Sequence, residues 1–373
     1  MKIALIRQRY TPFGGAERFV ANAVQALRAE GASLTVVTRQ WKSGGAGESL
    51  ICNPPYLGSL WRDWSFARCV CDTLKKHPFD LVQSHERIAC CDIYRAGDGV
   101  HREWLKQRRR VLGPLGKLGV VMNPYHRYTL AAEKKLFQNP GLKAVICNSR
   151  MVKEEIRHYF GLAEEKLHVI YSGVDMETFH PRLRALHRTR VRHEYNIPES
   201  AVLYLFVGSG FERKGLHTLL QAMTQLPSAS HLMVVGKDKH LGRYRNLAAR
   251  LGLANRVHFA HGQTDPKPFY GAADVFVLPT LYDPFPNTAL EAFACGLPVI
   301  TSTKSGAAEL VRAGENGFVC DALDQNGLAS VMARLADQSA RLRLGAAARE
   351  TVTHLAPENM ARQLLDLYRN LIQ

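Results

Sequence analysis

Residues 274–301 read DVFVLPTLYDPFPNTALEAFACGLPVIT, and this stretch decides the fold. The apolar run Asp274–Pro279 predicts a short buried strand of a parallel sheet. A helix is predicted over Thr288–Cys295, and Gly296 ends it. Pro298–Thr301 then begins a second strand. Strand, helix and strand in this order predict an α/β fold built on a parallel sheet.

The start of this helix predicts a site for an anion. Pro284 and Pro286 hold the chain extended, and Asn287 is a favourable N-cap. The amides of the first helical turn and the positive end of the helix dipole would face a ligand such as a phosphate. Asp283 and Glu291 bracket the site, and their carboxylates suit sugar or ribose hydroxyls because they would repel a phosphate. A surface loop followed by an ordinary capped helix is the alternative.

The composition is that of a globular protein of 373 residues, 46% of them hydrophobic, without an apolar run long enough to span a bilayer. This length suffices for two domains. Eight cysteines lie mostly in apolar runs without the paired spacing of metal ligands. We therefore expect buried thiols at Cys69, Cys71, Cys90 and Cys91, no metal site, and a reduced, cytoplasmic protein.

The net charge of +16 is unevenly spread along the chain. Residues 1–175 carry 27 Lys and Arg against 16 Asp and Glu, which is +11. Within them, residues 102–135 hold nine basic and two acidic side chains, interleaved with aromatic and aliphatic ones. Such a segment predicts binding to the surface of an anionic inner membrane. A pair of helices with solvated charges is the alternative, and no nucleic-acid-binding motif accompanies the charge.

Two pairs of residues in the first half are candidates for function. Gly14 and Gly15 follow the predicted strand Lys2–Ile6, at the carboxyl end where open α/β sheets bind ligands. Glycines there let a backbone approach a ligand closely, although a plain tight turn would look the same. Asp98 and His101 follow another predicted strand and are the candidates for chemistry. A capping aspartate and a surface histidine are the alternative.

The second half repeats the alternation of strands and helices. The predicted strand Val202–Val207 leads into a glycine-rich loop that contains Gly210 and ends with Arg213, Lys214 and Gly215. Two adjacent cations at a strand end suit a diphosphate, because Arg can clamp two oxygens and Lys adds a point charge. Cations at the start of a helix oppose its dipole, which favours a role in ligand binding over a structural role.

These patterns predict four parts. An N-terminal Rossmann-like domain covers residues 1–175, an arginine-rich linker covers 176–198, and a C-terminal Rossmann-like domain covers 199–356. The last part, 357–373, is a helix whose apolar side predicts that it docks on a domain.

The motifs resemble those of the retaining GT-B glycosyltransferases of family 4, which include bacterial sugar transferases and sucrose synthase. The resemblance runs nearly end to end and rests on four motifs: Gly14–Arg18, Val169–Asp175, Gly210–Gly215 and residues 283–291. The fourth motif departs from the family pattern, because Asp283 stands where the family has a glutamate that is one methylene longer.

The resemblance implies two Rossmann-like domains that face a central cleft, with a UDP-sugar held mainly by the C-terminal domain. Arg213 and Lys214 would neutralise the leaving diphosphate, and Asp283 would hold hydroxyls of the transferred sugar. The other implied contacts are those of the ribose with Glu291, of the phosphate oxygens with Asn287, Thr288, Ala289 and Leu290, of the base with Gly262 and Gln263, and of the diphosphate with Gly14, Gly15 and Gly210.

Within the family the chain is most similar to glucosyltransferases of the lipopolysaccharide core. This implies transfer of a hexose, glucose, from UDP-glucose to a lipopolysaccharide inner-core or related glycolipid at the cytoplasmic face of the inner membrane. The anomeric configuration would be retained by reaction on one face, with Asp98 or His101 positioning the sugar. No metal and no permanently bound cofactor are expected. The alternatives are another GT-B sugar-nucleotide enzyme, such as an epimerase, and a membrane-binding protein with a vestigial nucleotide site.

Overall fold

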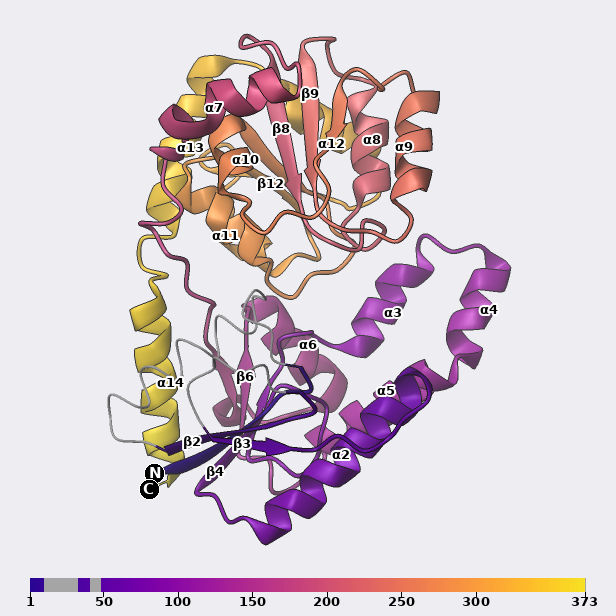
Figure 1. Ribbon diagram of the computed structural model, residues 1–373, viewed down its shortest axis with the longest axis vertical. Helices are drawn as coiled ribbons and strands as arrows, with labels where there is room; N and C mark the ends of the chain where they lie inside the picture. Colours follow the sequence, from indigo (N-terminus) through magenta and orange to yellow (C-terminus); the bar gives the residue numbers. More distant parts are fainter. Residues whose placement is uncertain (10–32, 41–47, 373) are drawn as a thin grey trace. The chain divides into compact units, whose positions relative to one another are not determined.

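The chain forms two compact units, each built on a parallel sheet, in a computed structural model that describes residues 1–9, 33–40 and 48–372 (Figure 1). The first unit comprises Met1–Gly173 together with Pro357–Gln373, and the second comprises Val174–Ala356. The prediction of two parallel-sheet α/β units is confirmed. Gly14 and Gly15 lie outside the described residues.

The first sheet has seven parallel strands in the order β3-β2-β1-β4-β5-β6-β7. The strand order reverses between β1 and β4, and ligands of open α/β sheets bind at the carboxyl ends of the strands at such a switch point. Almost every residue of these strands except those of β3 is buried, as expected for a sheet covered on both faces. The strands are β1 (Lys2–Ile6), β2 (Ser33–Thr38), β3 (Glu48–Ile51), β4 (Leu81–Ser84), β5 (Ile93–Arg95), β6 (Ala144–Cys147) and β7 (Leu167–Val169).

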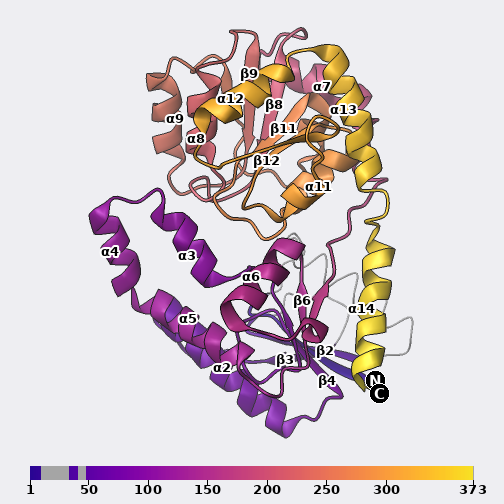
Figure 2. The same cartoon turned by 180° about the vertical axis from the view of Figure 1, so that it is seen from behind.

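Helices cover both faces of the first sheet (Figures 1 and 2). On one face α2 buries Phe66 and Val70 against β1 and β2. On the other face α14 packs its apolar side, which includes Leu364 and Tyr368, and the Tyr368 hydroxyl donates to Gln83 Oε1 at 2.6 Å. The helices of this unit are α2 (Gly58–Lys76), α3 (His101–Arg109), α4 (Pro114–Met122), α5 (Pro124–Phe137), α6 (Arg150–Phe160), the 3-10 turn η1 (Glu164–Lys166) and α14 (Pro357–Ile372).

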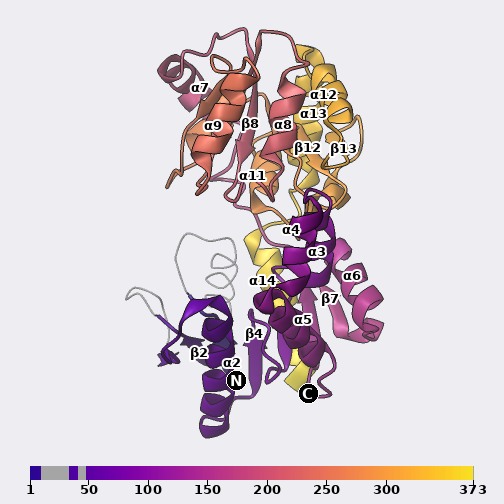
Figure 3. The ribbon, with the colours of Figure 1, turned by 90° about the vertical axis from the view of Figure 1, so that its right-hand side faces the viewer.

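The basic segment 102–135 forms α3, α4 and most of α5, which contact one another. Figure 3 shows the three helices gathered on one side of the first unit, and Figures 1 and 2 show α4 farthest from its sheet. Every residue of α4 except Val120 is exposed, so this helix has little packing of its own.

The second sheet has six parallel strands in the order β10-β9-β8-β11-β12-β13, and its strand order reverses between β8 and β11. Figure 1 shows α7, α10, α11 and α13 on one face and α8, α9 and α12 on the other. The strands are β8 (Val202–Val207), β9 (Ser230–Val235), β10 (Val257–Phe259), β11 (Val275–Leu278), β12 (Val299–Ser302) and β13 (Gly317–Cys320). The helices are α7 (Leu183–Glu194), α8 (Leu216–Met223), α9 (Leu241–Arg250), α10 (Lys267–Ala272), α11 (Asn287–Ala294), η2 (Gly306–Leu310), α12 (Gln325–Arg334) and α13 (Gln338–Thr351).

The segment 176–198, expected to be a linker, lies within the second unit. Its helix α7 packs against α10. The fully buried Arg192 donates to Asp274 Oδ2 at 2.6 Å. A buried ion pair of this kind fixes the position of α7 on the sheet, because separating the pair would leave a charge in an apolar environment.

The prediction of free thiols is wrong for two of the four cysteines named. Cys71 of α2 and Cys90, in the loop after β4, form a disulfide across a Cα–Cα distance of 5.8 Å. The two are 19 residues apart in sequence, and packing of α2 on the first sheet brings them together. Cys69 and Cys91 are free thiols, as expected, and Cys91 is buried.

Candidate functional site

An ion pair at the switch point of the second sheet is the centre of the candidate site. Lys214 lies in the loop after β8 and Asp283 in the loop after β11, and Lys214 Nζ contacts Asp283 Oδ2 directly. Arg213 NH1 lies 3.7 Å from the same oxygen and donates to Tyr282 O at 3.0 Å. The structure therefore brings together the two cations and the carboxylate that the sequence singled out.

Backbone contacts between the two loops fix the position of this pair. Leu281 N donates to Arg213 O at 2.8 Å, and Asp283 N donates to Lys304 O at 2.9 Å. Gly215 has a φ of +78°, and a Cβ at this position would lie 1.9 Å from Pro279 O. Only glycine allows the residue before α8 to approach the end of β11 so closely at this point. The backbone therefore holds the charged side chains before any ligand arrives.

Burial gives the pair its electrostatic character. Burial lowers the pKa of Lys214 below its usual value, and the Asp283 carboxylate opposes this effect. Both residues are less than a tenth exposed. Charges in such an environment interact more strongly with a ligand than exposed charges do, because little water screens them.

The helix α11 begins at Asn287, with Pro286 in the capping position. The prediction that Asn287 caps a helix starting at Thr288 is therefore wrong, because the helix takes in Asn287 as its own first residue. The amides of Asn287 and Thr288, in the first turn, have no partner within the helix by construction, whereas the Ala289 amide donates to Pro286 O at 3.0 Å. Thr288 Oγ1 and Ser305 Oγ are buried without a hydrogen-bond partner in the described part of the chain, so the site holds hydroxyls that a ligand could use.

Glu291 lies one turn into α11 and is 3% exposed. The Tyr270 hydroxyl donates to Glu291 Oε2 at 2.8 Å and to the Thr288 carbonyl at 3.2 Å. The carboxylate is thereby oriented by a residue of α10. A fixed carboxylate suits recognition of a vicinal diol, because it accepts two hydroxyl hydrogens at once.

The loops after β8, β9 and β10 join the site at the same edge of the sheet. Gly210 N donates to Lys237 O at 3.3 Å, and the side chain of Lys237 passes so close to Gly262 that a Cβ there would lie 2.3 Å from it. The Gln263 side-chain amide donates to Ala260 O. Gly210, Gly262 and Gln263 therefore lie in one connected set of loops.

The first unit holds its own candidate cluster at the carboxyl ends of β4 and β5. Asp98 is mostly exposed and lies 3.8 Å from Arg87 NH1. His101 N donates to Glu133 Oε1 at 2.8 Å, and Arg87 Nε donates to the same oxygen at 2.8 Å. Glu133 Oε2 is buried without a hydrogen-bond partner among the residues described. Asp98 and His101 are thus linked through Arg87 and Glu133.

His101 is neutral near neutral pH. Burial lowers its pKa to about 3, and the neighbouring Arg87 guanidinium acts in the same direction. Its Nε2 lies 3.1 Å from His126 Nδ1, and burial lowers the pKa of His126 as well. A neutral imidazole can donate or accept a hydrogen bond but adds no positive charge to the cluster.

The helix α4 presents an apolar surface flanked by basic residues. Leu115 is 86% exposed and Met122 68%, and Leu118 and Val121 are also more than half exposed. No helix among the described residues is long and apolar enough to cross a membrane. The described residues also contain no group of three or more His, Cys, Asp or Glu side chains arranged to hold a metal ion.

Sequence reasoning missed four residues of these clusters. Arg87 follows the strand end at β4, a position that could have marked it as a candidate. Glu133, Tyr270 and Ser305 carry no such signal, because tertiary packing alone brings them to the sites.

Two family models match the chain. Residues 13–178 match the model for Glycosyltransferase Family 4, and residues 187–351 match that for Glycosyl transferases group 1. Lipopolysaccharide glucosyltransferase WaaG of Escherichia coli (strain K12) is 27% identical over 346 residues, which cover 91% of this chain and 90% of the relative. Lipopolysaccharide core biosynthesis glycosyltransferase LpsE of Rhizobium meliloti (strain 1021) is 28% identical, with 91% of each chain covered.

Solved structures share the whole fold. The crystal structure of WaaG, described as a glycosyltransferase involved in lipopolysaccharide biosynthesis, matches with a TM-score of 0.84 at 25% identity, over 98% of this chain and 99% of the other. The structure of Anabaena Alr3699/HepE in complex with UDP-glucose matches with a TM-score of 0.76 at 20% identity, over 99% of this chain and all of the other. At that identity the likeness to the Anabaena protein shows the fold alone.

Proposed function

This chain belongs to the family 4 glycosyltransferases of the GT-B type, and we propose that it transfers glucose from UDP-glucose to a lipopolysaccharide inner-core or related glycolipid acceptor, with retention of the anomeric configuration. The observation that carries the proposal is the set of two fixed cations, Arg213 and Lys214, at the switch point of the second sheet.

The cations suit the leaving group of such a reaction. Cleavage of the bond between the sugar and the diphosphate develops negative charge on the diphosphate, and fixed cations and amides that face this charge lower the barrier. Lys214 and Arg213 supply the cations, and the start of α11 supplies amides together with the Thr288 hydroxyl. Asp283 contacts both cations and would also hold hydroxyls of the sugar.

The remaining donor contacts follow from the loops around the pair. The carboxylate of Glu291, oriented by Tyr270, would bind the ribose hydroxyls. Gly262 and Gln263 would contact the base, and Gly210 would lie along the diphosphate. The similarity to a lipopolysaccharide glucosyltransferase supports glucose as the transferred sugar.

The acceptor would be positioned by the cluster of the first unit. Neutral His101 is suited to hydrogen bonds with sugar hydroxyls, and so is Glu133 Oε2, which has no hydrogen-bond partner among the residues described. Asp98 would contribute from its exposed position. Transfer on one face of the sugar would let the leaving phosphate take the acceptor proton, so that no enzyme carboxylate needs to attack the anomeric carbon.

The exposed surface of α4 supports peripheral binding to an anionic inner membrane at its cytoplasmic face. Its apolar side chains would enter the interface while Arg109, Arg110 and Lys117 approach anionic head groups. Trp61 and Trp64 of α2 are each 46% exposed in the same unit, and tryptophan favours the membrane interface.

A panel of UDP-, GDP- and ADP-sugars, incubated with the protein and truncated lipopolysaccharide, tests the transferase proposal. We expect a mass increase of one hexose on the acceptor with UDP-glucose, and none when Lys214 is replaced by alanine. Cleavage of UDP-glucose that does not depend on an acceptor would indicate another class of GT-B enzyme. An absence of UDP-sugar binding in calorimetry would leave a membrane-binding protein with a vestigial site.

Sedimentation with anionic liposomes tests the membrane proposal separately. The double variant Leu115→Glu, Leu118→Glu places charge on the apolar side of α4 without touching the nucleotide site. We expect it to lose sedimentation, whereas Leu186→Glu, at an equally exposed leucine of α7, should sediment like the wild type. Equal sedimentation of all three proteins would refute membrane binding through α4.

A further inference from the structure

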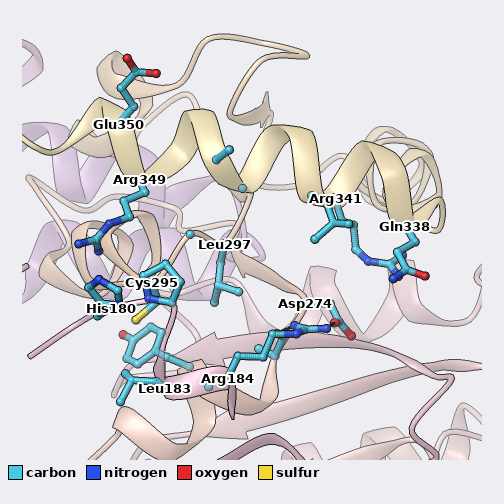
Figure 4. A pocket seen from close by; sticks show the side chains of 18 of the residues that line it. His180, Leu183, Arg184, Asp274, Cys295, Leu297, Gln338, Arg341, Arg349 and Glu350 are labelled. Atoms are coloured by element: carbon cyan, nitrogen blue, oxygen red, sulfur yellow. Dashed lines mark hydrogen bonds and ion pairs between the residues drawn. The ribbon is translucent and has the colours of Figure 1, made fainter. Parts of the chain in front are cut away.

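A cavity of about 570 Å³ lies inside the second unit, away from the loops of the donor site (Figure 4). Asp274 and Leu297 line it. Asp274 directly precedes β11 and Leu297 lies two residues before β12, whereas Asp283 follows the carboxyl end of β11. The cavity is therefore at the amino-end edge of the sheet. Its walls come from α7, α10, the end of α11 and α13.

The lining combines an apolar interior with basic side chains. Its apolar members include Pro181, Leu183, Tyr270, Leu297, Leu342 and Ala346. Leu342 is 65% exposed, which places it at a solvent-accessible rim. The volume falls within the roughly 300–1,000 Å³ typical of small-molecule sites. The cavity therefore has the size and surface of a ligand site rather than of a packing defect.

The charge of the lining is positive. The Asp274 carboxylate is already matched, because Arg184 and Arg188 lie 3.1 and 3.0 Å from its Oδ1. Arg341 donates to the carbonyls of residues 335 and 336, and Arg349 to those of 176, 179 and 294. Within the described chain neither Arg341 nor Arg349 pairs with a carboxylate.

Figure 4 shows Arg341 and Arg349 leaving α13 in different directions, Arg349 toward His180 and Arg341 on the side of Gln338, whereas Glu350 points away from the cavity. A carbonyl oxygen cannot neutralise a guanidinium as a carboxylate does, so both arginines keep their charge for an incoming group. We propose that this cavity binds a small amphipathic anion, with an apolar body between α7 and α13 and one carboxylate or phosphate group on Arg341.

The cavity shares structural elements with the donor site. The ring of Tyr270 lines the cavity, and its hydroxyl donates to Glu291 Oε2 at 2.8 Å. Helix α11 carries Glu291 and ends at Ala294, and the next residue, Cys295, lines the cavity. A ligand that shifts the Tyr270 ring or the end of this eight-residue helix therefore changes the position and orientation of the Glu291 carboxylate.

This coupling rests on the proposed binding of the nucleotide by Glu291. It makes the cavity a regulatory site, in which occupancy changes the affinity for UDP and UDP changes the affinity for the anion by the same factor.

Equilibrium dialysis with dodecanoate, below its critical micelle concentration and without membranes, tests the site. We expect one molecule bound per chain and at least tenfold weaker binding of dodecanol, which lacks the charge. Ala346→Trp should fill the cavity and abolish binding, since residue 346 is exposed on α13 and tolerates a larger side chain. Equal affinity of the wild type and Ala346→Trp, or of dodecanoate and dodecanol, overturns the proposal.

Two matched variants distinguish the cavity from the rest of the protein surface. Arg341→Gln should weaken dodecanoate binding about tenfold, as expected for loss of a charge-assisted contact, whereas Arg343→Gln on the same helix, outside the lining, should not. Leu118→Glu on α4 should also leave binding unchanged. Binding that depends on Leu118 instead of Ala346 would place the lipid on α4 and refute the cavity.

Calorimetry of UDP with and without dodecanoate tests the coupling. We expect the two affinities to differ in the wild type and the difference to shrink in Tyr270→Phe. Equal UDP affinities would refute the coupling. An absence of UDP binding with dodecanoate still bound would refute the proposed function and leave the cavity as a ligand site. Binding of UDP without binding of dodecanoate would refute the cavity as a ligand site and leave the proposed function.

Discussion

Replacement of Lys214 by alanine separates the catalytic role of the ion pair from its structural role. The change removes the cation in direct contact with Asp283 Oδ2 and leaves Arg213, 3.7 Å from that oxygen, as the remaining positive charge. If Lys214 faces the leaving diphosphate, its loss costs roughly 10²–10³ in the rate of transfer, as for other preorganised groups that stabilise developing charge.

The same change also destabilises the fold. Removing one partner of a buried ion pair typically costs about 3–5 kcal/mol, because the other charge stays buried without a partner. Here Arg213 still faces Asp283, and we therefore expect a smaller loss of about 2–3 kcal/mol. The double variant Lys214→Ala, Asp283→Asn removes both charges and should recover most of this stability.

Recovery of stability without recovery of activity is the expected pattern. Urea denaturation followed by circular dichroism reports the free energy of unfolding, and initial rates with UDP-glucose and truncated lipopolysaccharide report transfer. A Lys214→Ala protein within threefold of the wild-type rate would refute the assignment. A double variant that regained both stability and rate would show that Lys214 acts only by neutralising Asp283.

Three further predictions follow from single positions. His101→Gln should reduce the loss of folding stability in acid. Burial lowers the pKa of His101 to about 3, so below pH 6.5 this imidazole takes up a proton in the unfolded chain but not in the folded chain. In the wild type this difference should lower the free energy of unfolding, measured by urea denaturation, by about 2–4 kcal/mol at pH 3. Gly215→Ala should lower the melting temperature and the rate together, because its Cβ would overlap a backbone oxygen. Tyr270→Phe should weaken UDP binding about three- to tenfold in calorimetry, since Glu291 loses a hydrogen bond that orients it.

Local pattern was sufficient to predict the two sheets and most of their strands. Strands such as Val202–Val207 and Val275–Leu278 are continuous apolar runs, which a parallel sheet buried on both faces requires. The charged residues at their ends could be predicted for the same reason, because the carboxyl ends of parallel strands meet at one edge. Lys214 and Asp283 come together in this way, although 69 residues separate them.

Contacts made by side chains from distant elements could not be predicted. Tyr270 reaches Glu291 only because α10 packs beside α11, and no local pattern reports that packing. The Cys71–Cys90 disulfide depends likewise on how α2 lies on the sheet. The arginine-rich segment 176–198 was expected to be a linker, but Arg192 buries its charge against Asp274 and the segment lies within the second unit.

Asp283 occupies a position where the family has a longer glutamate. Its contacts indicate how the shorter side chain can still bind both the cations and a sugar hydroxyl. Both cations approach Oδ2, and in the described part of the chain Oδ1 has no hydrogen-bond partner. The backbone of Asp283 is held at both ends, by Lys304 O and by Gly306 N. The carboxylate can therefore neutralise the cations with one oxygen and accept a hydrogen bond from a sugar hydroxyl with the other.

A glutamate at position 283 would extend one methylene further into the space of the sugar. We therefore expect Asp283→Glu to change the preference among UDP-hexoses more than the affinity for UDP itself. If Asp283→Glu instead lowered the UDP affinity and the transfer rate with every sugar alike, the carboxylate would act only by neutralising Arg213 and Lys214.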